Sequence, residues 1–301
     1  MKKIAISVGD INGIGIEIAL RSHVEITRIC KPIYCINKTM LNRASALLKI
    51  DIPKDFTCKE CGEIFSIEAG KSTKEAGLLS YKSFCTAVKL AKQKKVKAIV
   101  TLPINKQSWR KADTPHMGHT DALSSQAIMM LGCENMFIIL YTHHIPLKHV
   151  SKIITSKKLK KFLLKVYNSL LIENIGVLGF NPHASDGGVI GKEDFKIVDA
   201  IKKVNKKLGR EVFKGPLVPD TAFTRKNREI FKYFVCMYHD QGLIPLKALY
   251  FDESINVSLN AGIIRTSVDH GTAYNIAYKN KNPSTTSFIN AIKKATSLCL
   301  N

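Results

Sequence analysis

The sequence lacks any apolar run long enough to cross a bilayer. Spanning the hydrocarbon core takes about 18 or more apolar residues, and the apolar run that follows Met1-Lys2-Lys3 ends at Gly9 and Asp10. This run is also too short for the apolar region of a secretory signal peptide. We therefore expect a soluble, cytoplasmic protein with no membrane partner.

The sequence also lacks the closely spaced cysteines of a disulfide-stabilised secreted domain. Its eight cysteines are scattered over 301 residues, which favours a reducing compartment. Cys58 and Cys61 have the spacing of half a zinc ribbon, but no second pair follows at a matching distance. We predict a reduced pair on a surface loop.

Acidic residues are scarce: 24 Asp and Glu stand against 46 Lys and Arg, so the net charge is +22. Such an excess alone would suit nucleic acid, a membrane surface or an anionic substrate. Nucleic-acid readers favour arginine with interleaved aromatics, whereas this chain has only eight arginines and 8% aromatics. We predict a solvated, lysine-rich surface and no nucleic-acid partner, with a non-catalytic polyanion-binding protein as the remote alternative.

Short apolar runs alternate with helical patterns along the chain. Runs at 3–8, 96–101 and 175–179 have the length of buried strands, and 74–94 and 157–172 have helical periodicity. This alternation predicts an α/β fold with a largely parallel sheet and helices on both faces. At 301 residues one core usually becomes two, so we expect two lobes, with ligands at the carboxyl ends of strands.

Three histidines follow apolar runs and precede turns: His144, His183 and His239. Neutral imidazole suits zinc, cobalt, nickel or iron, and three protein nitrogens leave positions open for substrate oxygens. A histidine viewed alone is more often an ordinary core or loop residue than a metal ligand. Together they predict one shared catalytic metal site.

Polar residues suited to an anionic substrate occur in other loop-like segments. Arginine and lysine form charge-assisted hydrogen bonds with phosphate or carboxylate, and arginine can do so bidentately. The alternative for the charged members is a simple surface role. The predicted substrate-binding residues are His119, Thr120, Lys247, Asn256 and Arg265.

Two carboxylates lie close to these segments in the sequence. Asp220 follows Pro219, and Asp240 follows His239. Either could orient a metal-bound imidazole or accept a proton, and either could instead serve as a helix cap or turn residue. Both are candidate catalytic residues.

Eight segments in this order resemble the 4-hydroxythreonine-4-phosphate dehydrogenase family of vitamin B6 biosynthesis. The resemblance covers nearly the whole chain, from residue 7 to about 290. The segments are Gly9-Asp-Ile-Asn-Gly-Ile-Gly15, Thr101-Leu-Pro-Ile-Asn-Lys106, Gly118-His-Thr120, His144-Ile-Pro-Leu147, Asn181-Pro-His183, Pro219-Asp-Thr221, Tyr238-His-Asp-Gln-Gly242 and Arg265-Thr-Ser-Val-Asp-His-Gly-Thr-Ala273.

The resemblance implies a two-domain fold related to isocitrate and isopropylmalate dehydrogenases. A discontinuous cofactor-side domain is expected at 1–110 plus 262–301, and a metal-binding, substrate-binding and dimer-forming domain at 111–261. It further implies a homodimer with a shared active site, in which one of the three metal-binding histidines comes from the partner chain. The bound cation would be one divalent metal per site, such as Zn, Co or Mg.

The resemblance also places the cofactor. Residues His270, Gly271, Thr272 and Ala273 resemble the adenosine-side loop of isocitrate-type dehydrogenases, so NAD or NADP is expected although no Gly-x-Gly-x-x-Gly fingerprint is present. Relatives usually carry Gly-Pro where this chain has Leu102-Pro103, and small residues or glycine where it has Tyr278 and Asn280. These departures leave the choice between NAD and NADP open.

The implied activity is a metal-dependent oxidation of 4-phosphohydroxy-L-threonine to a β-keto acid, which loses CO₂ to give 3-amino-2-oxopropyl phosphate. Lys247 or Asp240 would transfer the hydroxyl proton, and the sequence does not choose between them. The nearest alternative is a sister dehydrogenase that acts on a phosphorylated threonate or erythronate with the same metal site.

Overall fold

The computed structural model describes residues 1–124 and 126–299, which form two compact units. The first unit comprises Met1–Ala127 and Ile255–Asn301, and the second comprises Ile128–Ser254. The predicted α/β class is confirmed, since largely parallel strands alternate with helices in both units. No helix among the described residues is long and apolar enough to cross a membrane.

The sheet of the first unit is parallel except at one strand. Its strand order is β3 (Cys58–Lys59), β2 (Lys31–Cys35), β1 (Lys3–Ser7), β4 (Ala98–Thr101), β11 (Arg265–Val268) and β10 (Ile255–Leu259), and only β10 runs antiparallel to its neighbour β11. The central strand β1 is buried from Ile4 to Ser7. Continuous apolar strands of this kind belong to sheets covered on both faces.

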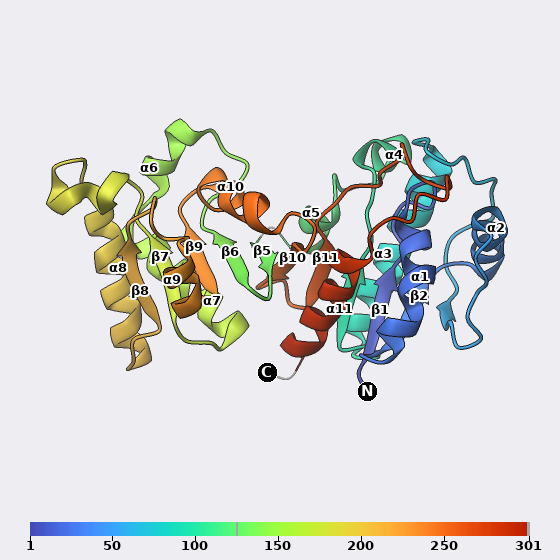
Figure 1. The fold of residues 1–301 in the computed structure, drawn as a ribbon, viewed down its shortest axis with the longest axis horizontal. Helices are drawn as coiled ribbons and strands as arrows, with labels where there is room; N and C mark the ends of the chain where they lie inside the picture. Colours follow the sequence, from blue (N-terminus) through green and yellow to red (C-terminus); the bar gives the residue numbers. More distant parts are fainter. Residues whose placement is uncertain (125, 300–301) are drawn as a thin grey trace. The chain divides into compact units, whose positions relative to one another are not determined.

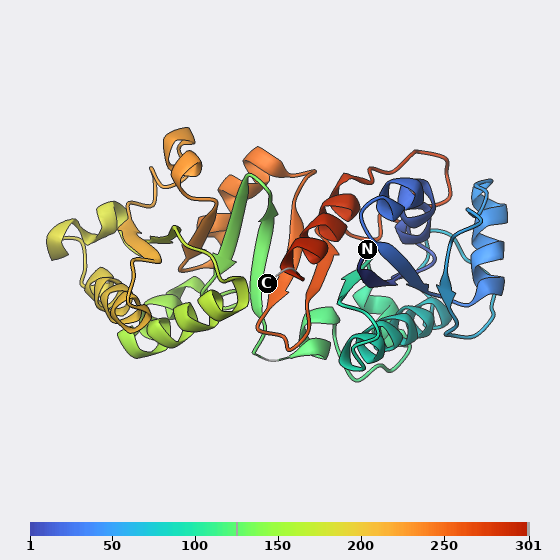
Figure 2. The ribbon, with the colours of Figure 1, turned by 90° about the horizontal axis from the view of Figure 1, so that it is seen from below.

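Helices cover both faces of this first sheet (Figure 2). Helices α1 (Gly15–Thr27) and α11 (Thr286–Leu298) pack together on one face, and α3 (Lys74–Lys92) covers the other. Helix α2 (Lys38–Leu48) flanks α1, and two short helices, α4 (Lys106–Lys111) and α5 (His119–Leu123), follow β4 along the chain. Side-chain N-caps begin three of these helices, at Asn37, Thr73 and Asn105.

The second unit has the same construction. Its strand order is β5 (Ile128–Cys133), β6 (Met136–Leu140), β9 (Tyr233–Cys236), β7 (Ile175–Leu178) and β8 (Phe213–Leu217), with only β5 and β6 antiparallel. Helices α7 (Ser156–Leu170) and α8 (Glu193–Leu208) pack side by side on one face, and α10 (His239–Tyr250) packs against β5, β6 and β9 (Figures 1 and 2). The shorter elements are η1 (Leu147–His149), α6 (Val150–Ile153), η2 (Pro182–Gly188) and α9 (Arg225–Ile230).

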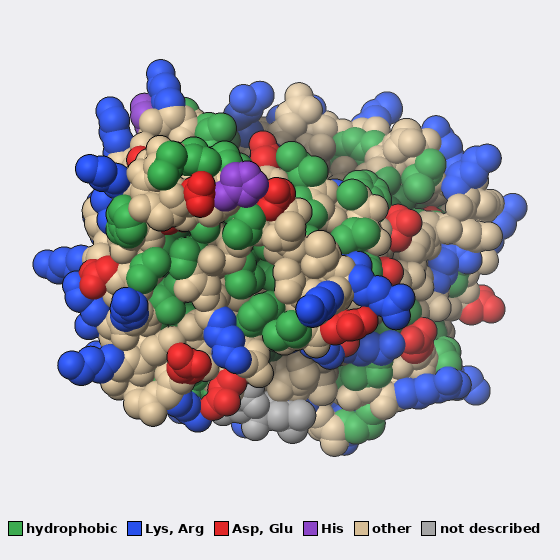
Figure 3. Space-filling model, turned by 60° about the vertical axis from the view of Figure 1, so that its left-hand side comes forward, with side chains coloured by type: hydrophobic (Ala, Val, Ile, Leu, Met, Phe, Trp, Pro, Cys, Tyr) green, Lys and Arg blue, Asp and Glu red, His purple; other side chains and the backbone are tan. Residues whose placement is uncertain are grey.

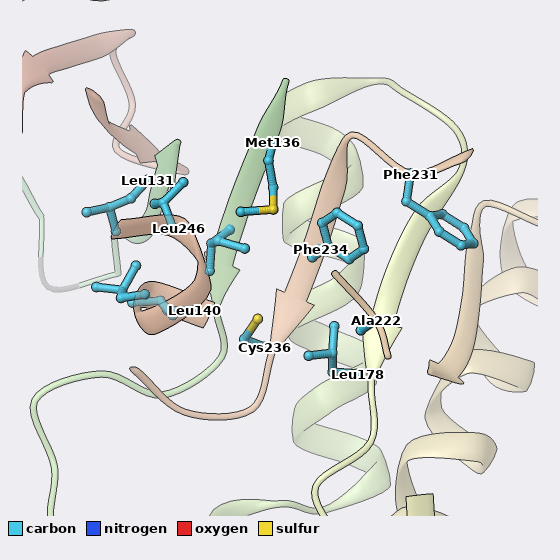
Figure 4. Close-up of a cluster of buried hydrophobic side chains, with 11 residues drawn as sticks. Leu131, Met136, Leu140, Leu178, Ala222, Phe231, Phe234, Cys236 and Leu246 are labelled. Atoms are coloured by element: carbon cyan, nitrogen blue, oxygen red, sulfur yellow. The ribbon is translucent and has the colours of Figure 1, made fainter. Parts of the chain in front are cut away.

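A buried apolar cluster joins α10 to the second sheet (Figure 4). Leu246 of α10 faces Leu140 and Met136 of β6, while Phe234 and Cys236 of β9 continue the layer. Because α10 begins with His239, this packing fixes the helix whose first residue is a predicted metal ligand.

The predicted surface loop at Cys58 and Cys61 is wrong for Cys58, which opens the edge strand β3 and pairs with Tyr34 of β2. Both cysteines are free thiols and half-buried. Burial raises the pKa of each thiol to about 11, so neither is a reactive thiolate at neutral pH.

Candidate active site

Two of the three predicted metal-binding histidines lie together in the second unit. His144 follows β6 and His239 follows β9, and these strands pair in parallel, so their carboxyl ends meet at one edge of the sheet. The ring centroids of His144 and His239 are 5.6 Å apart. Figure 3 shows histidine side chains at the surface with acidic side chains on either side.

His239 is oriented by its neighbour Asp240. The Nδ1 atom of His239 lies 2.7 Å from Oδ1 of Asp240. A carboxylate at Nδ1 fixes the ring and leaves Nε2 as the available ligand atom. Asp240 therefore has the contact that was predicted for a residue that orients a metal ligand.

His143 also belongs to this cluster, although the sequence offered it no role. Its ring lies 5.1 Å from that of His144 in an edge-on arrangement, and its buried Nδ1 has no hydrogen-bond partner among the described residues. Burial, followed by the nearby His144 and His239, lowers the pKa of His143. The His-His pair in the sequence was the signal that could have indicated it.

His183 stands in an unusual left-handed turn within η2. Residues His183, Ala184, Ser185 and Asp186 all have positive φ, between 42° and 70°. Non-glycine residues avoid this region, which costs roughly 1 kcal/mol or more at each position. The turn therefore needs support from outside its own backbone.

Asp194, in the first turn of α8, supplies that support. Its carboxylate accepts hydrogen bonds from the backbone N–H of Phe180 at 2.7 Å and of Asn181 at 3.2 Å, and from the hydroxyl of Ser185. Asp194 is only 2% exposed. No role for Asp194 was predicted from the sequence, because nothing in its local pattern distinguishes it from an ordinary acidic residue of a first helical turn.

The metal-binding capacity of the second unit rests on the pair His144 and His239. No ring contact or hydrogen bond among the described residues joins His183 to this pair, and no group of three His, Cys, Asp or Glu side chains within residues 1–124 and 126–299 is arranged to hold a metal ion. Two neighbouring imidazoles fit a divalent cation but supply only part of its usual ligand set. The complete triad stays a prediction.

The candidate proton-transfer residues divide into two places. Asp220 and Asp240 line one hollow of about 700 Å³ together with Tyr238 and Ile244. Lys247 lies further along α10, where its Nζ donates to Ser254 Oγ at 3.2 Å and sits 5.1 Å from the Phe251 ring centroid. The two carboxylates thus share a cavity whose lining does not include Lys247.

The first unit buries Arg265 beside His119. Arg265 is 3% exposed, and its Nη2 donates to Nδ1 of His119 at 3.2 Å. Burial lowers the pKa of Arg265 to about 10, and burial followed by the Arg265 charge lowers the pKa of His119 well below its usual value. No described carboxylate forms an ion pair with Arg265, so its charge has no compensating partner among the described residues.

The other two predicted substrate residues of this unit lie on neighbouring elements. Thr120 is half-buried on α5 directly after His119, and Asn256 is half-buried on β10, opposite Ser267 of β11. The first unit therefore carries four of the predicted substrate residues, and the second carries Lys247.

The predicted cofactor loop packs on the glycine turn that follows β1. The backbone O of Thr272 accepts from Ile14 N at 3.0 Å, and a Cβ at Gly13 would lie 2.7 Å from that oxygen. Gly271 is exposed with open space around it, Ala273 has φ 45°, and the buried Nε2 of His270 has no partner among the described residues. An exposed glycine and an unpartnered ring nitrogen fit a loop that receives a ligand.

Two tyrosines fasten this loop to the turn. Tyr274 donates to Oδ2 of the buried Asp10, and Tyr278 donates to the backbone O of Ile11, both at 2.8 Å. Burial raises the pKa of Asp10. No role for Asp10 or Tyr274 was predicted from the sequence.

The described residues form two α/β units, one with neighbouring imidazoles at the carboxyl ends of parallel strands and one with a buried arginine that no described carboxylate pairs with; these features define a protein of the α/β class. The family model described as pyridoxal phosphate biosynthetic protein PdxA matches residues 28–295. The chain belongs to this family, which is a family of oxidoreductases.

Relatives match over the full length of the chain. A 4-hydroxythreonine-4-phosphate dehydrogenase of Campylobacter fetus is 57% identical, with 99% of both chains covered. The enzyme of the same name from Sulfurimonas denitrificans is 56% identical, with 98% of this chain and 97% of that one covered. The crystal structure of a 4-hydroxythreonine-4-phosphate dehydrogenase from Burkholderia phymatum has a TM-score of 0.85 at 29% identity, with 99% of this chain and 98% of that one covered.

Proposed function

We propose that the protein oxidises 4-phosphohydroxy-L-threonine with NAD or NADP and a divalent metal, in the biosynthesis of pyridoxal phosphate. Relatives that are 57% and 56% identical over essentially the whole chain carry the name of this activity. The observation that carries the substrate assignment in this chain is Arg265, a buried cation with no carboxylate partner among the described residues. A phosphate group would compensate its charge.

The metal would be held by His144, His183 and His239. The adjacency of two of these rings and the contact of Asp240 with His239 support this ligand set. We propose a homodimer in which one of the three imidazoles comes from the partner subunit, consistent with the presence of only two neighbouring members in a single chain. Polarisation of the substrate hydroxyl is the chemistry that a bound divalent cation supplies, and hydride acceptance is that of the nicotinamide.

The chain's own residues would bind the substrate and move its proton. The proposed substrate-binding residues are His119, Thr120, Asn256 and Arg265, which belong to the first unit, and Lys247, which belongs to the second. Lys247, Asp240 or Asp220 would take the hydroxyl proton, and the hollow shared by the two carboxylates supports a proton-accepting role there. Oxidation at C3 would give the β-keto acid, whose loss of CO₂ yields 3-amino-2-oxopropyl phosphate.

The cofactor would lie against His270, Gly271, Thr272 and Ala273. The close packing of this loop on Gly13 and the two tyrosine hydrogen bonds support a preformed binding surface. As the resemblance implies, we propose residues 1–110 plus 262–301 as the cofactor-side domain and residues 111–261 as the metal-binding, substrate-binding and dimer-forming domain.

One experiment tests metal, cofactor and substrate together. Purified enzyme is analysed for bound metal and assayed for NADH and NADPH formation with 4-phosphohydroxy-L-threonine, with and without a chelator. A panel containing phosphorylated threonate and erythronate distinguishes the sister activity. Turnover that is lost with the chelator and restored by added divalent metal supports the proposal, while full turnover by metal-free enzyme contradicts it.

A further inference from the structure

The buried guanidinium of Arg265 is held by three neutral side chains. Of its five N–H groups, the Nε–H and one on Nη2 point to Oγ1 of Thr101, at 3.2 and 2.8 Å. Nη1 donates to Oγ of Ser258 at 3.1 Å, and Nη2 also donates to Nδ1 of His119 at 3.2 Å. Four of the five N–H groups are therefore used to fix the guanidinium, and none of the acceptors is charged.

The register of the sheet explains this arrangement. Thr101, the last residue of β4, pairs with Ser267 of β11, and side chains two apart on a strand share a face, so Thr101 lies on the same face as Arg265. Ser258 of β10 stands directly opposite Arg265. Strand pairing, and not a flexible loop, brings both hydroxyls to the guanidinium.

Each acceptor keeps a proton of its own. A hydroxyl that accepts from arginine still carries its O–H, and a histidine that accepts at Nδ1 carries its proton on Nε2. No acceptor for the hydroxyl protons of Thr101 and Ser258 occurs among the described residues, and the buried Nε2 of His119 has no partner there. The O–H groups of Thr101 and Ser258 and the Nε2–H of His119 are thus donors without an acceptor among the described residues, and none of these side chains carries a negative charge that would neutralise Arg265.

We propose that Thr101 and Ser258 are positioning residues for the substrate's phosphate, because they fix the orientation of Arg265 and each still carries a hydroxyl proton beside it. This inference rests on the proposed function for the identity of the anion. A fully ionised phosphate has only acceptor oxygens, so the unused N–H and O–H groups around Arg265 match it.

Thr101 carries the larger share of this role. Its single oxygen receives two N–H groups from the edge of the guanidinium, which stops the planar group from rotating. Thr101→Val keeps the shape of the side chain but removes that acceptor. Thr101→Ser keeps the oxygen and removes only a methyl group.

The test measures the KM for 4-phosphohydroxy-L-threonine, kcat, and the thermal-shift response to inorganic phosphate with no cofactor present. Thr101→Val is expected to raise KM by about ten-fold or more with little change in kcat, and to weaken phosphate binding in parallel, because charge-assisted hydrogen bonds are lost. Thr101→Ser is expected to restore both towards wild type. Ser258→Ala, which removes one acceptor, is expected to show a smaller effect in the same direction.

Thr266→Val is the matched control. Thr266 is equally buried on β11, but its hydroxyl donates to the backbone O of Ala291 at 2.8 Å, away from Arg265. The control should lose stability without a change in KM. Equal KM values for Thr101→Val and Thr266→Val, or failure of Thr101→Ser to restore KM, would overturn the inference.

The phosphate measurement separates this inference from the proposed function. An enzyme with no turnover of 4-phosphohydroxy-L-threonine whose phosphate binding still follows the Val and Ser pattern would refute the function and support the positioning role. An active enzyme whose phosphate affinity is the same in all variants would refute the positioning role alone.

Discussion

The hydroxyl of Tyr274 donates a 2.8 Å hydrogen bond to Oδ2 of Asp10, residues that lie at opposite ends of the sequence. Asp10 is fully buried and also accepts from the backbone N–H of Asn12 at 3.0 Å. The contact joins the segment after the predicted cofactor loop to the turn that precedes α1. The shape of the loop therefore depends on a buried carboxyl group.

Replacing Tyr274 by Phe is expected to lower the free energy of unfolding by about 1 to 3 kcal/mol, because a buried acceptor loses its partner, and to raise the KM for the nicotinamide. Urea unfolding and steady-state kinetics measure the two effects. Tyr141→Phe is the control, since it removes a hydroxyl that donates to Ile153 O at 3.2 Å in the second unit. An equal rise in cofactor KM for both variants would refute a specific role of Tyr274.

The pH dependence of stability should change in Asp10→Asn. Burial raises the pKa of Asp10 in the folded state above its usual 3.8. Between the pKa of the unfolded state and that of the folded state, the folded protein therefore binds more protons than the unfolded chain. Over this pH interval, Asp10 lowers the free energy of unfolding as the pH rises. Asn does not titrate. The free energy of unfolding of the variant minus that of wild type should therefore increase from low pH towards neutrality, as followed by urea unfolding across this range. A difference that is constant with pH would show that Asp10 does not titrate differently in the two states.

Gly13→Ala is expected to displace the cofactor loop. The added Cβ would lie 2.7 Å from the backbone O and 2.9 Å from the Cβ of Thr272, and both distances are too short for unbonded atoms. The variant should show a raised cofactor KM and a lowered melting temperature. Gly271→Ala has open space and should keep its melting temperature, so a selective rise in its cofactor KM would indicate close approach of the cofactor to that backbone. Wild-type cofactor KM in Gly13→Ala would contradict the proposed position of the loop.

His144→Ala should lose bound metal and activity together, because the cation that His144 is proposed to hold would also polarise the substrate hydroxyl. Metal content by elemental analysis and NADH formation measure this. His143→Ala is expected to be much milder on both readouts, although its ring lies 5.1 Å from that of His144. If His144→Ala keeps its full metal content, or if His143→Ala loses as much metal as His144→Ala, His144 is not the metal ligand proposed here.

Leu246→Ala should lower the free energy of unfolding by about 2 to 5 kcal/mol, since it opens a cavity in the cluster between α10 and the second sheet. Leu249 lies on the same helix but is 46% exposed, so Leu249→Ala should change stability by less than about 1 kcal/mol. Chemical denaturation of the two variants gives the comparison. Similar losses would mean that α10 is not held by this packing.

The repeating elements of the fold could be predicted from the sequence, because burial imposes a pattern on them. The run at 96–101 and the helical stretches at 74–94 and 157–172 correspond to β4, α3 and α7 within a few residues. The edge strand β3 was missed because it has only two residues and no apolar pattern. Its existence depends on pairing with β2, which is a tertiary effect.

The candidate site was predictable where chemistry limits the choice of residue. Three histidines after apolar runs indicated a metal site, and polar residues that included Arg265 indicated an anion site. The structure brings His144 next to His239 and His119 next to Arg265, although Arg265 opens strand β11 and does not lie in the loop-like segment that was expected. The supporting residues Thr101, Ser258, Asp10 and Asp194 were not predictable, because their roles depend on strand register and on contacts between distant segments. Hydroxyl and carboxylate residues of this kind are common at strand ends and helix starts, so their local sequence carries no distinguishing signal.

The four consecutive non-glycine residues in left-handed conformation that begin at His183 depend on the start of helix α8. Left-handed backbone is unfavourable for residues other than glycine. The Asp194 carboxylate, at the start of α8, holds the chain just before this turn by accepting hydrogen bonds from the backbone N–H groups of Phe180 and Asn181. The direction in which the His183 imidazole is presented is thus determined by where α8 begins. A substitution that shifts the first turn of α8 would therefore change the orientation of the His183 imidazole, although no residue of the left-handed turn is replaced.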